Sequence, residues 1–434
     1  MHRILAVCFL AFAIQAFGQS AGNFSPKQRI ERIRHLGKTN SAQAIPALAQ
    51  SLKDPDRDVR VEAVRAIVKI GTEASLDPLI EAAHDRDSEV EILATDGLVN
   101  FYLPGYVVKG GLTGPLTHGV RQVKSFFSSR NDQVIGPDVT VRQDVASAIG
   151  DVVRSGSGID ARSNAARAAG ILRASGAVPA ILDGLRSKNS ELIFECLVAL
   201  QKIKDPAAGP RVSFLARDLD PRIQMEALQT IGVLKSVESA PDVRSALANG
   251  SNEKIRRKAL ETLAMLGQTE DRATFKRFVD SSDPRSRVAA LEGLGRLREP
   301  EDYPIANHAY NEKDAGPAVH LAAAFAMVEE GNVSTAEFSP LQYLFENLNS
   351  QDLGDTAQAY MTEVFRNAAV RNAVIPLATG ATRDQKIRLC AAFGASQSED
   401  VVPVLTKLSS DIDPQVSLAA STALQKVKTR KTSD

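Results

Sequence analysis

One short pattern recurs along the chain, and it limits the possible folds more than any other feature. The segment from Asp54 to Gly71, DPDRDVRVEAVRAIVKIG, joins a polar turn to an amphipathic helix, and close variants begin at Asp218, Ser251 and Asp411. Aligned on one small residue, the variants form a ladder with steps of 29 to 34 residues and one step of 71. The ladder residues are Ala63, Ala94, Ala165, Cys196, Ala227, Ala259, Ala290, Ala323, Ala357, Ala391 and Ala420. Such a period predicts a solenoid of stacked helical units.

Each unit is expected to contain two helices. In the second helix of the first unit, Val59, Ala63 and Ile67 lie four residues apart and therefore share one face. The first helix is marked by a proline 15 to 19 residues before the ladder residue, because proline is tolerated in a helix's first turn. These prolines are Pro46, Pro78, Pro179, Pro210, Pro241, Pro304, Pro340, Pro376 and Pro403. The pattern predicts an all-α solenoid of about eleven helix pairs in a right-handed superhelix, with the ladder residues buried.

Paired helices with an early proline, and a second helix that starts D-x-D-x-x-V-R, resemble HEAT repeats, in particular the bacterial variety named after phycobilisome lyases. The resemblance covers residues 41–428, with one interruption. In such repeats the arginines after the turn bond turn carboxylates of neighbouring units. The resemblance therefore implies a structural arginine ladder of Arg60, Arg256, Arg287 and Arg388. It implies little about function, because one fold serves many roles.

The two ends of the array differ from its middle. Residues 26–38 read as a lone second helix, a half-repeat that caps the N-terminal end with a polar face carrying Lys27, Arg29 and Arg32. Residues 429–434 are too polar to pack and are expected to be disordered.

Residues 1–18 have the composition of a secretory signal peptide. Arg3 precedes an apolar run over residues 4–17, and small residues favour cleavage after Gly18. The alternative is a buried or membrane-spanning helix, but the run is shorter than the ~20 residues that a span requires. We therefore expect an exported protein, periplasmic or secreted, without a membrane span after cleavage. Cys196 and Cys390 lie far apart in the array and are not expected to form a disulfide. Because Cys196 takes a ladder position, it is interpreted as a small core residue rather than a nucleophile.

The step of 71 residues marks an insertion. Residues 142–153, RQDVASAIGDVV, can supply a first helix without proline, which leaves residues 101–138 outside the ladder. This stretch holds five of the 22 aromatic residues, so an ordered excursion that contacts a partner is one interpretation. Alternatively it is a divergent repeat, or its aromatics fold back over the edge of the array. The candidate partner-binding residues are Tyr102, Tyr106, Lys109, Arg121, Lys124, Phe126 and Phe127, whose cations favour an acidic partner.

Charge and motifs narrow the function. Lys plus Arg equals Asp plus Glu at 52 each, and a chain without a basic excess is a poor candidate for binding nucleic acid. No G-x-S-x-G, C-x-x-C or H-E-x-x-H motif occurs, so no catalytic residue, metal site or cofactor is predicted. We interpret the chain as a non-catalytic scaffold that binds a protein or peptide on the concave face of the second helices and through residues 101–138. The alternative is an enzyme, or an enzyme-associated subunit, of the phycobilin-lyase kind that the resemblance implies.

Overall fold

The computed structural model describes residues 24–107, 133–136 and 139–429. The chain forms two compact units, unit 1 (Met1–Ser239) and unit 2 (Ala240–Asp434). All regular secondary structure in the described ranges is helical, which confirms the all-α prediction. No helix in these ranges has the length and apolar character needed to cross a bilayer.

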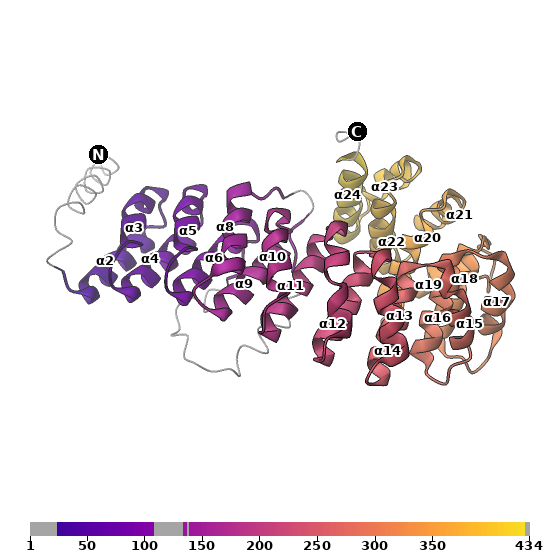
Figure 1. Cartoon of the computed structure of the whole chain (residues 1–434). Coiled ribbons are helices and arrows are strands. Elements are labelled where there is room, and N and C mark those ends of the chain that lie inside the picture. The colour runs from indigo at the N-terminus through magenta and orange to yellow at the C-terminus, as the bar shows by residue number, and fades with distance from the viewer. Residues whose placement is uncertain (1–23, 108–132, 137–138, 430–434) are drawn as a thin grey trace. The chain divides into compact units, whose positions relative to one another are not determined.

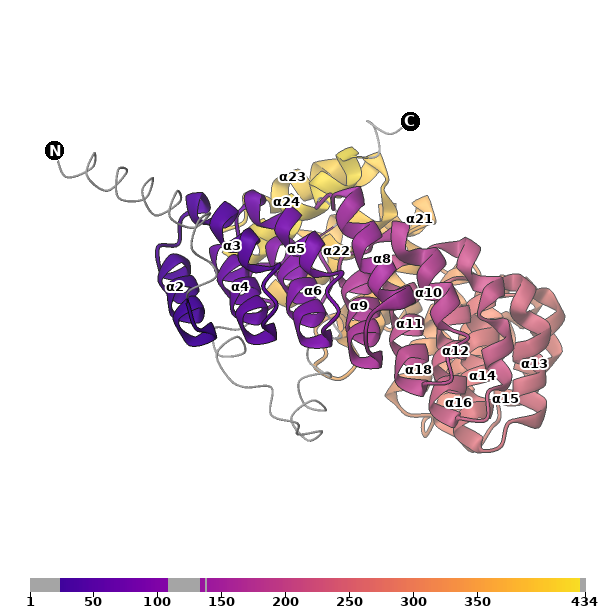
Figure 2. The same ribbon diagram turned by 60° about the vertical axis from the view of Figure 1, so that its left-hand side comes forward.

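Unit 1 begins with a lone helix, α2 (Pro26–Lys38), and continues with helix pairs (Figure 1). The pairs are α3 (Ile45–Ser51) with α4 (Arg57–Ile70), α5 (Leu76–Ala82) with α6 (Ser88–Tyr102), α8 (Gln143–Ser155) with α9 (Ile159–Ile171), and α10 (Val178–Gly184) with α11 (Ser190–Ile203). In the fifth pair two 3-10 helices, η5 (Pro206–Arg211) and η6 (Ser213–Arg217), precede α12 (Pro221–Val233). Figures 1 and 2 show α3, α5, α8 and α10 in one layer and α4, α6, α9 and α11 in the other.

Unit 2 repeats this plan. Its pairs are α13 (Ala240–Asn249) with α14 (Glu253–Leu266), α15 (Arg272–Phe278) with α16 (Pro284–Leu297), α17 (Tyr303–Asn311) with α18 (Pro317–Glu329), α19 (Pro340–Asn347) with α20 (Gly354–Val364), α21 (Ala368–Ala378) with α22 (Arg383–Ser396), and α23 (Val402–Leu408) with α24 (Pro414–Thr429). Short 3-10 helices lead into many first helices: η2 (Ala42–Ala44), η3 (Glu73–Ser75), η4 (Ser175–Ala177), η7 (Val237–Ser239), η8 (Thr269–Asp271), η9 (Pro300–Asp302) and η10 (Glu399–Val401). The described residues thus contain the eleven predicted pairs. The handedness of the array stays a prediction.

The polar turn between the helices of a pair sets where the second helix starts. The Asp54 carboxylate accepts a hydrogen bond from the backbone N–H of Asp56 at 2.9 Å, which closes the turn. Asp56 then caps α4 by accepting from the N–H groups of Asp58 and Val59. The N-cap lies seven residues before the ladder residue in α4, and the same spacing holds in α6, α9, α11, α12, α14, α16 and α18.

The predicted ladder is confirmed at ten positions and wrong at one. The nine ladder residues from Ala63 to Ala357, and Ala420, have no exposed surface. Ala391, in contrast, is exposed. Thr382 caps α22, and the seven-residue spacing places Leu389, which is fully buried, at the ladder position. The alignment failed here because it followed a small side chain, whereas the cap fixes the register.

Two of the nine prolines also differ from the prediction. Pro376 lies near the end of α21 rather than in its first turn, and the helix is started instead by the side-chain cap of Asn367. Pro210 lies inside the 3-10 helix η5. The other seven lie in the first turn of their helices, as predicted.

Neighbouring second helices pack closely enough to require glycine at some contacts. A Cβ at Gly170 of α9 would lie 2.8 Å from the Cα of Ala199 in α11. In unit 2 a Cβ at Gly295 would lie 2.6 Å from the Cα of Ala326. Small residues at these positions therefore set the spacing between successive units.

Candidate binding site

The predicted partner-binding segment is described only at its ends. Lys109, Arg121, Lys124, Phe126 and Phe127 lie outside the described residues. Their role in binding stays a prediction.

The start of the segment packs against the array. Tyr102 is the last residue of α6, and its hydroxyl accepts a hydrogen bond of 3.1 Å from the backbone N–H of Arg142. The Asn100 side chain accepts hydrogen bonds from the N–H groups of Gly105 and Val107, which bends the chain after the helix. Tyr106 is only 3% exposed, so its ring belongs to the core and not to a surface that a partner could reach.

The end of the segment also returns to the second helices of unit 1. The backbone N–H of Ile135 donates to the carbonyl of Ile171 in α9 at 3.0 Å, and the Ile135 side chain is buried. Lys202 of α11 donates to the carbonyl of Gln133 at 3.4 Å. For its described ends, the structure therefore agrees with the alternative in which the segment covers the edge of the array.

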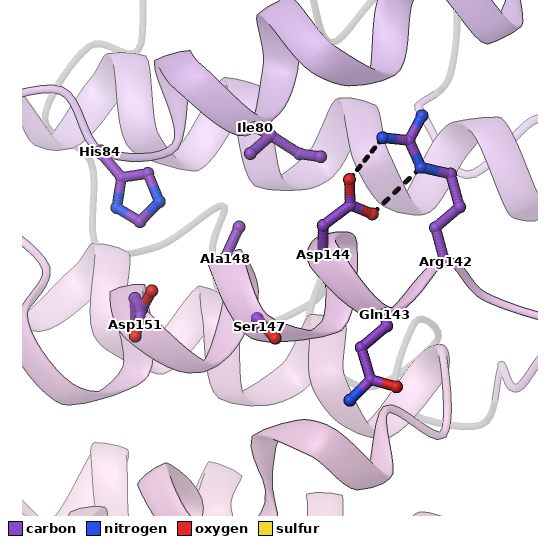
Figure 3. A pocket seen from close by; sticks show the side chains of 8 residues that line it. All are labelled: Ile80, His84, Arg142, Gln143, Asp144, Ser147, Ala148 and Asp151. Atoms are coloured by element: carbon purple, nitrogen blue, oxygen red, sulfur yellow. Dashed lines mark hydrogen bonds and ion pairs between the residues drawn. The ribbon is translucent and has the colours of Figure 1, made fainter.

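A pocket of about 580 Å³ lies between α5 and α8, the two first helices that flank the insertion in sequence (Figure 3). Ile80 of α5 and His84 from the following turn line one side. The other side is lined by Arg142, Gln143, Asp144, Ser147, Ala148 and Asp151. The pocket thus lies where the array resumes after the insertion.

The charged side chains at one end of the pocket bind one another. Arg142 donates from Nη2 to Asp77 at 2.7 Å and from Nε to Asp144 at 3.0 Å, as Figure 3 shows for Asp144. The hydrogen bond from Arg142 is the main cause that lowers the pKa of Asp144 below its usual range. Arg142 is therefore occupied by its own carboxylates and is not available to bind an anionic ligand.

The other end of the pocket holds His84, Ser147 and Asp151, the side-chain types of a nucleophilic triad (Figure 3). Ser147 and Asp151 lie one helical turn apart on α8, and His84 faces them from the α5 side. No hydrogen bond joins His84 to either residue in this described part of the chain. A nucleophilic triad needs those contacts to activate its serine, and this arrangement does not have them.

Residues 14–98 and 240–328 match a family model described as HEAT repeats. The chain contains HEAT repeats. No curated protein matches its sequence. Among solved structures it is similar to an engineered protein (17% identity, 88% of this chain and 98% of that one, TM-score 0.38) and to importin beta (11% identity, 97% and 66%, TM-score 0.37). It is also similar to a structure concerned with a phosphorylation switch between cadherin and β-catenin (11% identity, 91% and 96%, TM-score 0.38). Identities and TM-scores this low carry no argument about function, and the phycobilisome-lyase variety stays a prediction.

The predicted arginine ladder of these HEAT repeats lies at the turns. Arg60 donates to both carboxylate oxygens of Asp85 in the next repeat, at 2.7 and 2.9 Å, and to the carbonyl of Asp54. Arg287 donates to Glu312 of the next repeat and to the carbonyl of Val279. Both side chains therefore join two repeats at their turns.

The other two members have different partners. Arg388 donates to Asp355 and to the carbonyl of Leu348, both in the preceding repeat. Arg256 donates to the carbonyl of Gly250 within its own repeat at 3.0 Å, and in this turn Gly250 and Asn252 take the places that Asp54 and Asp56 have in the first repeat. The structure does not bring the four arginines together into one site.

A second set of ion pairs, between successive second helices, was missed from the sequence. Arg65 of α4 pairs with Glu89 of α6 at 3.2 Å, and Arg167 of α9 pairs with Glu195 of α11 at 2.8 Å. Each arginine lies two residues after a ladder residue, and this recurrence is the signal that could have revealed them. Arg167 and Glu195 are almost completely buried, so this pair contributes to the core of the HEAT repeats rather than to a ligand site.

The two described cysteines are buried thiols. Both have no exposed surface, and they form no disulfide. Burial raises the pKa of Cys390 to about 12 and that of Cys196 further, which suppresses the thiolate that a nucleophile or metal ligand would need. In the part of the chain that the structure describes, no three His, Cys, Asp or Glu side chains come together as metal ligands.

Proposed function

We propose that this chain is a non-catalytic scaffold that binds a protein or peptide along the second helices of unit 1. The observation that carries the proposal is a stripe of partly exposed apolar side chains in a protein built of HEAT repeats. The stripe consists of Ile92 of α6, Phe194 of α11 and Met225 of α12, each two residues before its ladder residue. The same position holds Val61 in α4 and Ser163 in α9, which are buried, so the stripe is continuous only from α11 to α12. Because the register repeats, these side chains point to the same face of the layer.

The chemistry of the stripe suits a peptide. Phe194 and Met225 offer aromatic and flexible apolar contacts, which are enriched at protein interfaces. Arg222 of α12 lies over the Phe194 ring, with its Cζ 3.9 Å from the ring centroid, and its side chain is half exposed. Arg222 also donates to Glu191 at 3.1 Å, so its charge is already paired within the chain. A partner that places an apolar side chain on Phe194 and Met225 would match the stripe.

The test places a photo-crosslinking amino acid at Met225 in the full chain, expressed in its native cell. The matched control carries the same amino acid at Asp183, an exposed position in the first-helix layer. We expect a specific crosslinked partner from position 225 and none from position 183. Equal crosslinking at both positions, or none at either with the partner bound elsewhere, would refute the stripe as the binding surface.

We also propose that the protein works outside the cytoplasm. The support is the sequence of residues 1–18, with Arg3 before an apolar run and small residues before Gln19. Mass spectrometry of the protein from its native cell should find an N-terminus at Gln19. An intact N-terminus at Met1 in the cytoplasmic fraction would contradict both the cleavage and the compartment.

A further inference from the structure

Helix α18 is apolar on every side. Its sequence is PAVHLAAAFAMVE, and every residue from Leu321 to Val328 is apolar and at most 3% exposed. A helix of this kind must be enclosed on all sides. Yet α18 is a second helix, and in a two-layer array one side of a second helix faces away from the first-helix layer. Something else in unit 2 must cover that side.

The cover is made by the helices on either side of α18, which meet across it. Arg296 of α16 donates from Nε and Nη2 to the two carboxylate oxygens of Glu363 in α20, at 2.9 and 3.1 Å. The Tyr360 hydroxyl of α20 donates to Glu292 of α16 at 2.5 Å. Under these contacts the Phe325 ring of α18 stacks on Tyr360, with 4.5 Å between the ring centroids.

The Arg296 side chain contacts four successive second helices. Besides Glu363 of α20, Arg296 binds Glu292 of its own helix and the carbonyl of Ala264 in α14, at 3.2 and 3.3 Å. Its guanidinium also lies over the Phe325 ring of α18, 5.3 Å from the centroid. In an ordinary helical repeat array each unit contacts only its neighbours. Here α16 and α20 belong to units two steps apart.

The partial burial of Arg296 and Glu363 strengthens the ion pair between them. The Arg296 and Glu363 side chains are only 13% and 18% exposed, so water and salt screen the pair weakly. The pairing is bidentate, which fixes its geometry as well as its charge. Removing Arg296 would leave the Glu292 and Glu363 carboxylates without their shared cation, whereas removing Glu363 would leave Arg296 paired with Glu292 alone.

We propose that the Arg296–Glu363 and Tyr360–Glu292 contacts, here called the clasp, are a conformational lock that closes the second-helix face of unit 2 over α18. With the clasp closed, Leu321 and Phe325 are inaccessible to a partner. With the clasp open, they form an apolar face on unit 2. The inference goes beyond the proposed function, which concerns the second helices of unit 1, and either can fail without the other.

The test compares hydrogen exchange of the full chain with that of two clasp variants. Glu363→Gln keeps the shape and one hydrogen bond, and Arg296→Met keeps the length of the side chain without its charge. The control is Glu312→Gln, which weakens the pair with Arg287, an ion pair between neighbouring repeats whose arginine is similarly buried but whose glutamate is 35% exposed. Binding of an apolar fluorescent dye serves as an independent measure of the exposed face.

If the clasp is a lock, both variants raise exchange in α18 and α20 about tenfold and increase dye binding, while helix content stays unchanged. Glu312→Gln leaves exchange in α18 at its original rate. Unchanged protection of α18 in Glu363→Gln, the milder variant, would overturn the proposal. So would exchange that rises equally in every helix of unit 2, because that pattern reports general destabilisation and not local opening.

Discussion

Glu330 follows the last turn of α18, and its environment disfavours its charge. Both carboxylate oxygens are buried, and neither has a hydrogen-bond partner among the described residues. Burial, and then the negative charge of Asp302, raise the pKa of Glu330 to about 8. The C-terminal end of a helix adds to the effect, because its partial charge is also negative.

This raised pKa predicts a dependence of stability on pH. Between pH 4.5 and about 8 the folded state keeps the proton on Glu330, whereas the unfolded state releases it, so the free energy of unfolding falls as pH rises. Glu330→Gln cannot ionise, so its free energy of unfolding does not fall over this pH range, and it should be more stable than the original protein at pH 8 by roughly 1 kcal/mol. This is a small fraction of the free energy that the full pKa shift would give, because Glu330 is partly exposed and solvent reduces the effect. At pH 4 the variant and the original protein should be equally stable.

Chemical denaturation at the two pH values measures the effect. The control is Glu337→Gln, an exposed glutamate eight residues from the end of α18, which should change stability equally little at both pH values. A Glu330→Gln variant that is no more stable than the original at pH 8 would show that Glu330 is ionised in the folded state.

For single residues, the sequence predicted burial well and predicted contacts with other residues or with a binding partner poorly. Cys196 was assigned to the core because it recurs in register with alanines, and it has no exposed surface. Tyr106 was assigned to a partner surface because it lies outside the repeat, but a residue outside the period can still pack against the array. The Arg142 pairs were not predicted either, since Asp77 is 65 residues away in sequence and no period relates the two.

At the scale of structural elements, the turn before α12 allows a direct test of helix capping. Asp220 caps α12 by accepting a hydrogen bond from the N–H of Arg222 at 2.9 Å. Asp220→Ala removes this acceptor and should lower the free energy of unfolding by about 1 kcal/mol. Leu219, the adjacent residue, is 98% exposed, so Leu219→Ala should leave stability nearly unchanged.

Urea denaturation of the two variants separates capping from a general sensitivity of the turn. Equal losses in both would mean that the turn is stabilised by something other than the Asp220 cap. No loss in Asp220→Ala would mean that water replaces the carboxylate without cost.

The helix pairs themselves could be predicted because each unit carries the same local signals. The prediction extended even to α8, which has no proline and follows the insertion. It failed where a different residue gives the same signal, as Asn367 does at the start of α21 and Leu389 does in the ladder. A pattern based on one residue type cannot detect such replacements, whereas the spacing from cap to core can.

At the scale of the whole molecule, the period describes contacts between neighbouring units and nothing longer. It therefore predicted the stack and could not predict the clasp, which joins α16 to α20 across an intervening unit. The composition of α18 did contain a signal, because a second helix without a polar side must be covered. The candidate pocket between α5 and α8 had no such signal, since it depends on how the chain returns after the insertion.

Because each repeat packs mainly against its neighbours, a local packing defect should disturb only nearby repeats. Gly170→Ala would place a Cβ 2.8 Å from the Cα of Ala199, so α9 and α11 must separate. The expected loss is roughly 1–2 kcal/mol, after the higher helix propensity of alanine is counted. Gly176→Ala is the control: its Cβ would lie 3.5 Å from the nearest atom, an ordinary contact, and stability should hardly change.

Hydrogen exchange of the full chain should then show faster exchange in α8 to α11, with the change fading along unit 1. In α22 and α24 of unit 2 the exchange rates should match those of the original protein, because no packed contact carries the defect that far. The Gly176→Ala variant should show the original pattern throughout. An equal rise in α24 and α9 would mean that the whole chain unfolds as one cooperative block, and the description of this protein as a stack of locally stabilised repeats would have to be abandoned.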